Sequence, residues 1–206
     1  QWGDEQSDAL HRIDAGVSYD DEELKANSSR WLYIKGPPGS GKTLLLLEAA
    51  IRCAKKCLRV LIVCPTGTSV YVFKSQLPEF DGVDKIAVGT IQGVLKYKRP
   101  GADSNVPWCP PTALRQYDVL LFDEASQYED VDWLRMWKSV MEQPHKPYCT
   151  VVADFQQLQP VTNGGECRNY CKCMGDQVTL KTVYRTADQE HLLFLNRIRV
   201  EQPDRP

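Results

Sequence analysis

Apolar residues along this chain come in short, almost unbroken runs separated by longer amphipathic stretches. Five runs are typical of strands buried on both faces, because they are β-prone and apolar almost throughout. They are WLYIK from residue 31, RVLIVCP from 59, KIAVGT from 85, DVLLFDE from 118 and CTVVAD from 149. Helical composition and spacing follow in TLLLLEAAIRCAKKC from 43 and DVDWLRMWKSVMEQ from 130. This alternation predicts βαβ units, with a parallel sheet between helices in a three-layer α/β/α fold.

Two segments interrupt the alternation. Residues 96–112, KYKRPGADSNVPWCPPT, are rich in proline and polar residues, which predicts a long loop insertion before the next strand. From Leu180 a new helical pattern opens and then ends in a proline-broken stretch. We therefore expect one domain over residues 1–179 and the start of a truncated second domain over 180–206, in a piece of a longer protein.

Composition narrows the function classes. A net charge of -2 gives no overall electrostatic case for nucleic acid, so any such binding must come from a local surface. No apolar run reaches the roughly 18 residues of a membrane span. The eight cysteines are scattered, and several lie in predicted core elements, which favours reduced thiols in an intracellular protein. We expect the nucleus or mitochondrion in a eukaryote, and otherwise the cytoplasm.

A phosphate-binding loop is the clearest chemical signal. GPPGSGKT matches G-x-x-x-x-G-K-[ST], with a predicted strand before it and a predicted helix after it. The glycines let successive backbone N–H groups point inward, Lys42 would reach the β- and γ-phosphates, and the Thr43 hydroxyl would bind Mg²⁺. The expected nucleotide-binding residues are Gly36, Pro37, Pro38, Gly39, Ser40, Gly41, Lys42 and Thr43. The alternative is a glycine-rich turn without a ligand.

The second element of such a site is acidic. YDVLLFDEASQ places Asp123 and Glu124 at the end of a buried strand, which we expect to be a neighbour of the strand before the loop. Asp123 would hold Mg²⁺ through its water shell, and Glu124 would accept a proton from the attacking water. An acidic pair that only begins the next helix is the alternative.

These motifs resemble those of superfamily-one helicases. GPPGSGKT, CPTGTS from 64, GTIQGVL from 89, DEASQ from 123 and ADFQQLQPV from 153 are similar to motifs I, Ia, Ib, II and III, in that order. The tail LKTVYRTADQEHLLFLNRIR from 180 is similar to the start of the second motor domain in the PIF and RecD-like branch, 1B. The resemblance implies a RecA-like P-loop NTPase fold and an ATP- and Mg²⁺-dependent 5′–3′ DNA helicase motor.

The resemblance also assigns roles to single residues. Gln6 is placed like the glutamine that reads adenine, and Gln157 like the one that senses the γ-phosphate. Arg185 matches an arginine that reaches the γ-phosphate from the second domain. Ala153, Gln159 and Gln127 depart from the common form of the motifs, and none of them is a phosphate or metal ligand.

Nucleic-acid contacts follow from the same resemblance. It predicts that five residues contact the bound nucleic acid: Pro65, Thr66, Gly67, Thr90 and Gln92. Gln92 stands where the family often has histidine. Tyr71, Phe73 and Trp108 are candidates for base stacking, although core or interface packing explains them more readily. GPPGSGKT and DEASQ are also similar to motifs of RNA-decay helicases, so single-stranded DNA is the expected partner and RNA stays open.

Two further segments allow two interpretations each. The insertion at 96–112 is either a reduced duplex-splitting wedge with Trp108 near its tip or a surface loop. Cys167, Cys171 and Cys173 are either zinc ligands or free thiols. Free thiols are favoured, because the spacing is not C-x-x-C and no histidine lies nearby.

Two classes of function therefore compete. The first is a monomeric helicase motor domain whose partner is a missing second RecA-like domain. The second is a stand-alone nucleotide-binding module without motor activity. A P-loop kinase or GTPase is disfavoured, because ADFQQLQPV has no role there and no N-K-x-D motif occurs.

Overall fold

The sheet is parallel throughout. The computed structural model describes residues 2–18, 30–96, 112–156 and 165–184. Within them, six strands pair in the order β3-β2-β4-β5-β1-β6. They are β1 (Trp31–Lys35), β2 (Val60–Cys64), β3 (Ile86–Thr90), β4 (Val119–Phe122), β5 (Tyr148–Ala153) and β6 (Asp176–Thr179). The five strands expected from the sequence are confirmed, and β6 extends the sheet at the β1 edge.

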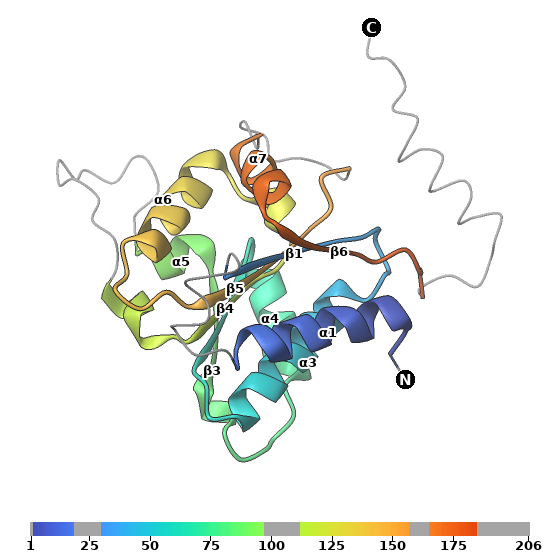
Figure 1. The fold of residues 1–206 in the computed structure, drawn as a ribbon. Coiled ribbons are helices and arrows are strands. Elements are labelled where there is room, and N and C mark those ends of the chain that lie inside the picture. Colours follow the sequence, from blue (N-terminus) through green and yellow to red (C-terminus); the bar gives the residue numbers. More distant parts are fainter. Residues whose placement is uncertain (1, 19–29, 97–111, 157–164, 185–206) are drawn as a thin grey trace, which may run out of the picture.

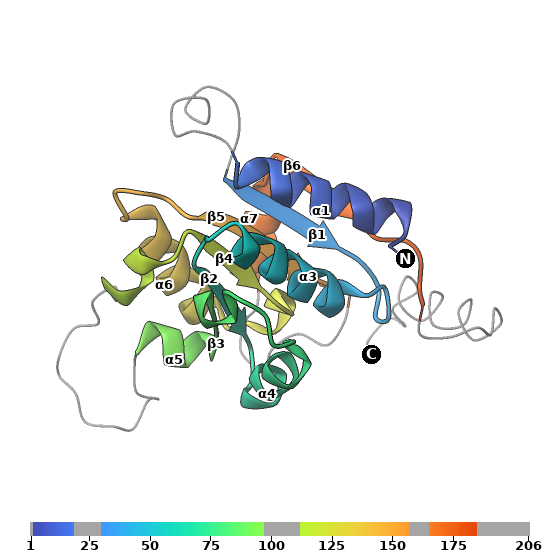
Figure 2. The same ribbon diagram turned by 90° about the horizontal axis from the view of Figure 1, so that it is seen from below.

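Helices cover both faces of this sheet (Figures 1 and 2). One face carries α1 (Asp4–Gly16), α3 (Lys42–Lys55) and α4 (Gly67–Gln76). The other carries α5 (Ile91–Leu95), α6 (Asp130–Met141) and α7 (Gly165–Cys173). Short 3₁₀ turns lie at Val83–Lys85, Thr112–Gln116 and Ala125–Gln127. The three-layer α/β/α prediction is confirmed, as are the helices expected at α3 and α6.

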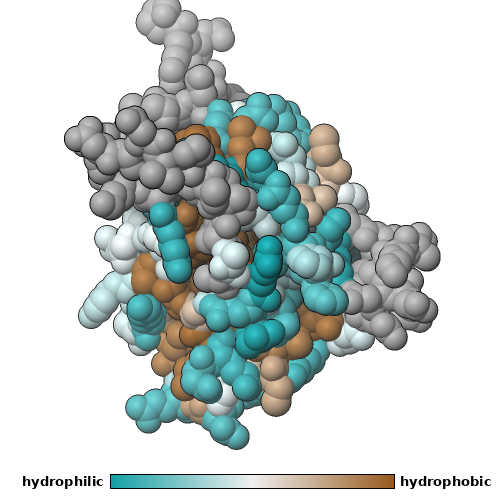
Figure 3. Space-filling model, turned by 90° about the vertical axis from the view of Figure 1, so that its left-hand side faces the viewer, coloured by the Kyte–Doolittle hydropathy of each residue, from teal (hydrophilic) through white to brown (hydrophobic). Residues whose placement is uncertain are grey.

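Two apolar cores explain the unbroken apolar runs of the strands. In β1, Leu32 and Ile34 pack toward α1 and α3, while Trp31 and Tyr33 pack toward α6 and α7. The Trp31 ring stacks on that of Trp137, with 4.6 Å between their centroids. A parallel strand covered on both sides has no polar face to show, which is why its sequence does not alternate. On the coloured part of the face that Figure 3 shows, hydrophilic and hydrophobic residues are interspersed.

Strand order corrects one expectation. We expected the acidic pair to follow a strand adjacent to β1, and this is wrong: β5 lies between β1 and β4. The sequence gives the order of strands along the chain but not their order in the sheet. The consequence is that residues 154–156, which follow β5, lie between the phosphate loop and the acidic pair.

Several elements had no clear sequence signal. Helix α1 buries only Ala9, Leu10 and Ile13 among its apolar residues, because it covers an edge of the domain rather than its centre. Strand β6, DQVT, buries Val178 and little else. Such short or mostly polar segments fold where they do because of the neighbours they meet.

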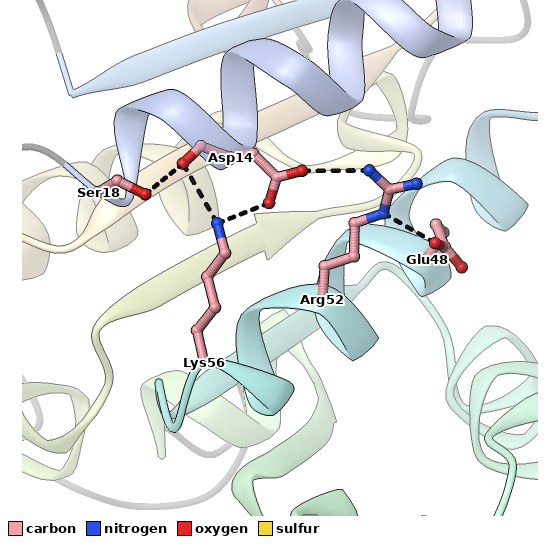
Figure 4. A network of polar contacts seen from close by, with 5 residues as sticks. All are labelled: Asp14, Ser18, Glu48, Arg52 and Lys56. Atoms are coloured by element: carbon pink, nitrogen blue, oxygen red, sulfur yellow. Dashed lines mark hydrogen bonds and ion pairs between the residues drawn. The ribbon is translucent and has the colours of Figure 1, made fainter.

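A polar network fastens α1 to α3 (Figure 4). The Asp14 carboxylate accepts from Lys56 Nζ at 2.8 Å and from Arg52 Nη1 at 3.1 Å. Arg52 Nε also donates to Glu48 at 2.8 Å, and the Ser18 hydroxyl donates to the Asp14 carbonyl at 2.7 Å. Partial burial raises the pKa of Asp14, but the bonds from Lys56 and Arg52 outweigh it and leave the pKa below its ordinary value.

We expect Asp14→Asn to lower the free energy of unfolding by about 1 kcal/mol at pH 7, because the network is partly exposed and screened by solvent. Since the folded pKa is the lower one, this contribution is present above the ordinary pKa of 3.8 and is lost as the pH falls through the folded value. Urea unfolding at pH 7 and at about pH 2.5 measures both.

Glu142→Gln is the control, because it breaks an exposed pair with Lys138 whose side chains are 52% and 61% accessible. Its unfolding free energy should stay within about 0.5 kcal/mol of the parent. Equal losses in the two variants would contradict a specific role for Asp14.

Candidate nucleotide-binding site

The functional motifs meet because the strands are parallel. The carboxyl ends of all six strands lie at one edge of the sheet, where ligands bind in folds of this architecture. The phosphate loop leaves this edge after β1, Asp123 after β4 and Asp154 after β5. Pro65 follows β2, and Thr90 ends β3. Motifs that are far apart in sequence are thus assembled along one line.

The phosphate loop has the backbone that a cradle needs. Gly39 and Gly41 both have φ of 79°, a region that only glycine adopts without strain. The turn is closed by Ser40, whose hydroxyl donates to the Pro37 carbonyl at 2.8 Å. Helix α3 begins at Lys42, so its N-terminal N–H groups and its positive end of the dipole face the loop.

Lys42 is folded back into this loop. Its ammonium donates to the carbonyls of Gly36 and Pro37, both at 2.9 Å, and the residue is only 5% exposed. A buried ammonium needs such partners, and a phosphate group offers it stronger, charged ones. The lysine therefore already lies where an incoming phosphate would meet it.

The acidic pair lies against the loop. Asp123 is 3% exposed, and burial together with the neighbouring Glu124 raises its pKa to about 7, although Lys42 and a hydrogen bond with Thr43 act in the opposite direction. Glu124 has a left-handed backbone, with φ of 46°. For a residue other than glycine this is uncommon, and such strain is frequent at functional sites.

The carboxylates fit a divalent cation. Asp123 Oδ1 and Glu124 Oε2 are buried and have no hydrogen-bond partner in the part of the chain that the structure describes. Leaving two such acceptors unpaired is costly, unless a ligand binds them. Hard cations such as Mg²⁺ take oxygen ligands, which the Thr43 hydroxyl and the Asp123 carboxylate supply.

A cavity of about 420 Å³ opens above these groups. It is lined by Pro38, Gly39, Gly41, Lys42, Thr43, Leu44, Glu124 and Tyr184. Sequence reasoning did not single out Tyr184, which is 53% exposed beside the loop. The signal for it was weak, because an aromatic residue before Arg185 has no pattern of its own.

Gln6 reaches the loop from α1. Its amide donates to the Ser40 carbonyl at 3.0 Å and its Oε1 accepts from the Gly3 N–H at 3.1 Å. A methyl group at Gly41 would lie 2.5 Å from the Gln6 amide nitrogen. The structure thus brings Gln6 to the phosphate loop, and its reading of adenine stays a prediction.

The predicted nucleic-acid residues lie at the same edge and have structural roles as well. Thr66 and Thr90 are N-caps, accepting from the backbone N–H groups of Ser69 and Gly93 at 3.2 and 3.1 Å. The Gln92 amide donates to Asp132 at 2.6 Å, so only part of its hydrogen-bonding capacity is available to a ligand. Pro65 is half-buried and Gly67 is exposed.

The aromatic candidates separate clearly. Phe73 is completely buried, so the packing interpretation is the right one for it, whereas Tyr71 is 73% exposed on α4. Trp108 and the insertion around it lie outside the described residues, as do Gln157 and Arg185. Of the motif ADFQQLQPV the structure describes residues 153–156, in which the Asp154 carboxylate accepts from the Gln156 N–H at 3.2 Å.

A second cavity, of about 560 Å³, lies beside the loop. Four cationic side chains line it: Lys35, Arg168, Lys172 and Lys181. None of these four forms an ion pair within the described ranges, and the one acid in the lining, Asp154, is 2% exposed. Positive charge is therefore concentrated here, although the whole chain is slightly acidic.

The three candidate cysteines all lie in α7. Cys167 and Cys171 are buried and hydrogen-bond to each other, and burial raises the pKa of Cys167. Cys173 is exposed, and no group of three potential metal ligands occurs in the ranges that the structure covers. Among the same residues, no helix has the length and apolar character to cross a bilayer.

Comparison with known proteins identifies the family and the fold. A family model described as an AAA domain matches residues 22–205. No curated protein sequence matches the chain significantly. Among solved structures, the Pif1 helicase from Candida albicans is similar with a TM-score of 0.63 and 19% identity, over 97% of this chain and 44% of that one.

Two other structures share the fold. Unliganded Pif1 from Bacteroides sp has a TM-score of 0.59 and 16% identity, over 96% of this chain and 45% of its own. The Hef helicase domain of Pyrococcus furiosus has a TM-score of 0.52 and 15% identity, over 90% and 39%. This chain thus spans less than half the length of these helicases, and at such identities the likeness shows the fold, which is that of a RecA-like P-loop domain.

Gly41→Ala should abolish nucleotide binding, with an increase in Kd of at least about a hundredfold. Alanine is strained in the left-handed backbone at this position, and the new methyl group, 2.5 Å from the Gln6 amide nitrogen, displaces Gln6 from the Ser40 carbonyl of the cradle. Titration with a fluorescent ATP analogue and Mg²⁺ measures this. Gly175→Ala is the matched control, because nothing lies within 4 Å of its added Cβ, and it should bind like the parent.

Proposed function

This chain belongs to the AAA domain family, and on that premise we propose that it is the ATP-hydrolysing motor domain of a superfamily-one DNA helicase of the PIF and RecD-like type. One observation carries the proposal. Lys42, which is buried, and Glu124 line one cavity, and Asp123 lies next to Glu124, so that two buried, unpartnered carboxylate oxygens lie close to the lysine, as a Mg²⁺-nucleotide requires. A glycine-rich turn without a ligand would have no reason to keep these three groups out of water.

Each residue has a separate task in hydrolysis. Lys42 exchanges its bonds with the Gly36 and Pro37 carbonyls for bonds with β- and γ-phosphate oxygens. Thr43 and Asp123 would hold Mg²⁺, which when bound would neutralise charge on those oxygens. Glu124, which lines the cavity and has a strained backbone, accepts the proton of the attacking water.

The nucleic-acid side rests on the same edge of the sheet. Pro65, Thr66 and Gly67 follow β2, while Thr90 ends β3 and Gln92 follows it, at the sheet edge from which the phosphate loop also leaves. The 560 Å³ cavity beside the phosphate loop is lined by four cationic side chains, which suits the binding of a phosphodiester backbone. Single-stranded DNA is the proposed substrate, with 5′–3′ movement, and RNA is the alternative.

A complete motor requires a second wall for the nucleotide. We assign Gln157 to sensing the γ-phosphate and Arg185 to stabilising its transition state, with the second RecA-like domain beginning at about residue 180. Two domains closing on ATP produce steps along a strand, whereas one domain binds ATP and turns it over slowly. Residues 1–206 are therefore expected to show nucleic-acid-dependent but slow hydrolysis.

A stand-alone nucleotide-binding module is the competing function. It would bind ATP without any response to nucleic acid. The intact set of Lys42, Thr43, Asp123 and Glu124 favours the motor, because a module that only binds nucleotide has no use for a general base.

ATP hydrolysis by residues 1–206 should increase at least about threefold with single-stranded DNA, and Glu124→Gln should lose about a hundredfold of it while still binding ATP. Phosphate release with DNA, RNA or neither measures both. Stimulation by RNA alone would reassign the substrate. ATP binding with no stimulated turnover, in a chain extended to include the second domain, would favour the module.

Arg168→Ala combined with Lys172→Ala should lower the affinity for single-stranded DNA and make that affinity less dependent on salt concentration. If both cations contact phosphates, the slope of log K against log[salt] should become less steep by about 1.4, at roughly 0.7 per phosphate. Fluorescence anisotropy of a labelled oligonucleotide from 50 to 300 mM salt gives the slope. The control combines Lys55→Ala with Lys138→Ala, which removes the same amount of charge from the C-terminal ends of α3 and α6. An equal change in the slope for this control would contradict a local site.

A further inference from the structure

The segment that leaves β6 runs directly along the phosphate loop. We call residues 180–184 the strap. At its start the Leu180 N–H donates to the Lys35 carbonyl at 2.8 Å, and at its end the Tyr184 N–H donates to the Gly39 carbonyl at 2.9 Å. The strap forms no helix or strand, so these two backbone hydrogen bonds hold it in place of the regular bonds that a strand would make with its neighbour. Both ends are therefore tied to the elements that form the cradle.

Helix α1 holds the middle of the strap. The Glu5 carboxylate accepts from the Lys181 N–H at 2.6 Å and from the Thr182 N–H at 3.3 Å, across a separation of 176 residues in sequence. Bonds to an ionised acceptor are stronger than those between neutral groups. Two consecutive backbone donors are thus fixed by one side chain on another element.

Packing at this junction leaves no spare room. A Cβ at Gly36 would lie 2.9 Å from the Leu180 Cβ and 3.1 Å from its carbonyl oxygen. A Cβ at Gly3 would collide with the Tyr184 hydroxyl. The strap, the start of α1 and the phosphate loop are therefore in direct contact, and none can shift without moving another.

Adjacent residues of α1 divide two tasks between them. Gln6 bonds the Ser40 carbonyl of the cradle, while Glu5 bonds the strap. Tyr184 then lines the 420 Å³ nucleotide cavity, while Leu180 and Lys181 line the 560 Å³ basic cavity. The strap forms part of the wall of both cavities, and Glu5 sets its position in each.

We propose that Glu5 is a positioning residue for the nucleotide, which acts by holding the strap so that Tyr184 forms a fixed wall of the cavity. The inference rests on the proposed ATP-binding function. Tyr184 is more than half exposed on a segment without regular structure, so its ring gains contact with a ligand at low entropic cost only if the strap is already ordered. Glu5 supplies that order from outside the cavity, without touching the ligand.

A double-mutant cycle tests this directly. The Kd of a non-hydrolysable ATP analogue with Mg²⁺ is measured by calorimetry for the parent, Glu5→Ala, Tyr184→Ala and the double variant. We expect increases in Kd of about fivefold for Glu5→Ala and about tenfold for Tyr184→Ala. The double variant should bind no more weakly than Tyr184→Ala, because both changes remove the same contact.

Two further variants separate positioning from general effects. Glu5→Gln keeps an oxygen acceptor and should restore most of the affinity. Asp4→Asn removes the neighbouring exposed charge in the same helical turn, so it controls for the helix dipole and should leave Kd unchanged. Melting temperatures without ligand show whether each variant is folded.

The outcomes are distinct. If the Kd of the double variant increases by the product of the two single effects, about fiftyfold, then Glu5 acts independently of Tyr184 and the inference is overturned. A lower melting temperature of Glu5→Ala with unchanged Kd would also overturn it, since Glu5 would then be purely structural. If the parent chain does not bind the analogue at all, the proposed function fails and the inference fails with it.

Discussion

Burying Lys42 and Asp123 beside one another is the constraint on which the site depends. An ammonium that is 5% exposed and a carboxyl that is 3% exposed must both find partners inside the fold. The loop carbonyls of Gly36 and Pro37 serve the lysine, and Thr43 serves the aspartate in part. One oxygen each on Asp123 and Glu124 remains without a hydrogen-bond partner among the described residues, and a bound cation would supply one. The phosphate loop therefore satisfies its buried lysine without a ligand, while the acidic pair still lacks partners that a ligand can supply.

The sheet makes this arrangement possible. All six strands point the same way, so the loops that follow them share one edge and their polar groups converge there. Apolar cores on both faces hold the strands rigid, with α1, α3 and α4 on one side and α5, α6 and α7 on the other. Because the cores contain few polar atoms, the chemistry is confined to the edge. The nucleotide cavity and the basic cavity lie there side by side, with the strap as their common wall.

Helix α1 shows how an element with a weak sequence signal can matter for function. It packs on α3 through Leu10 and Ile13 and through the Asp14 network, which fixes its distance from the phosphate loop. That placement brings Gln6 to Ser40 and Glu5 to the strap. The residues that fasten the helix and those that face the site lie at opposite ends of it, so its anchoring does not interfere with its contacts at the cradle.

The sequence alone determined the five apolar strands, the phosphate loop and the acidic pair, because each depends on residues that are neighbours in the chain. A run such as VLIVC is strand-like wherever it folds, and glycines at 39 and 41 fit the positive φ that the loop needs. Only the tertiary structure decided that β5 separates β1 from β4, that Phe73 is core, and that Gln92 bonds Asp132. It also decided that Glu5 meets residues 181 and 182, and that Tyr184 lines the cavity. These contacts join residues that no local pattern links, since strand order and helix docking are set by how the whole chain packs.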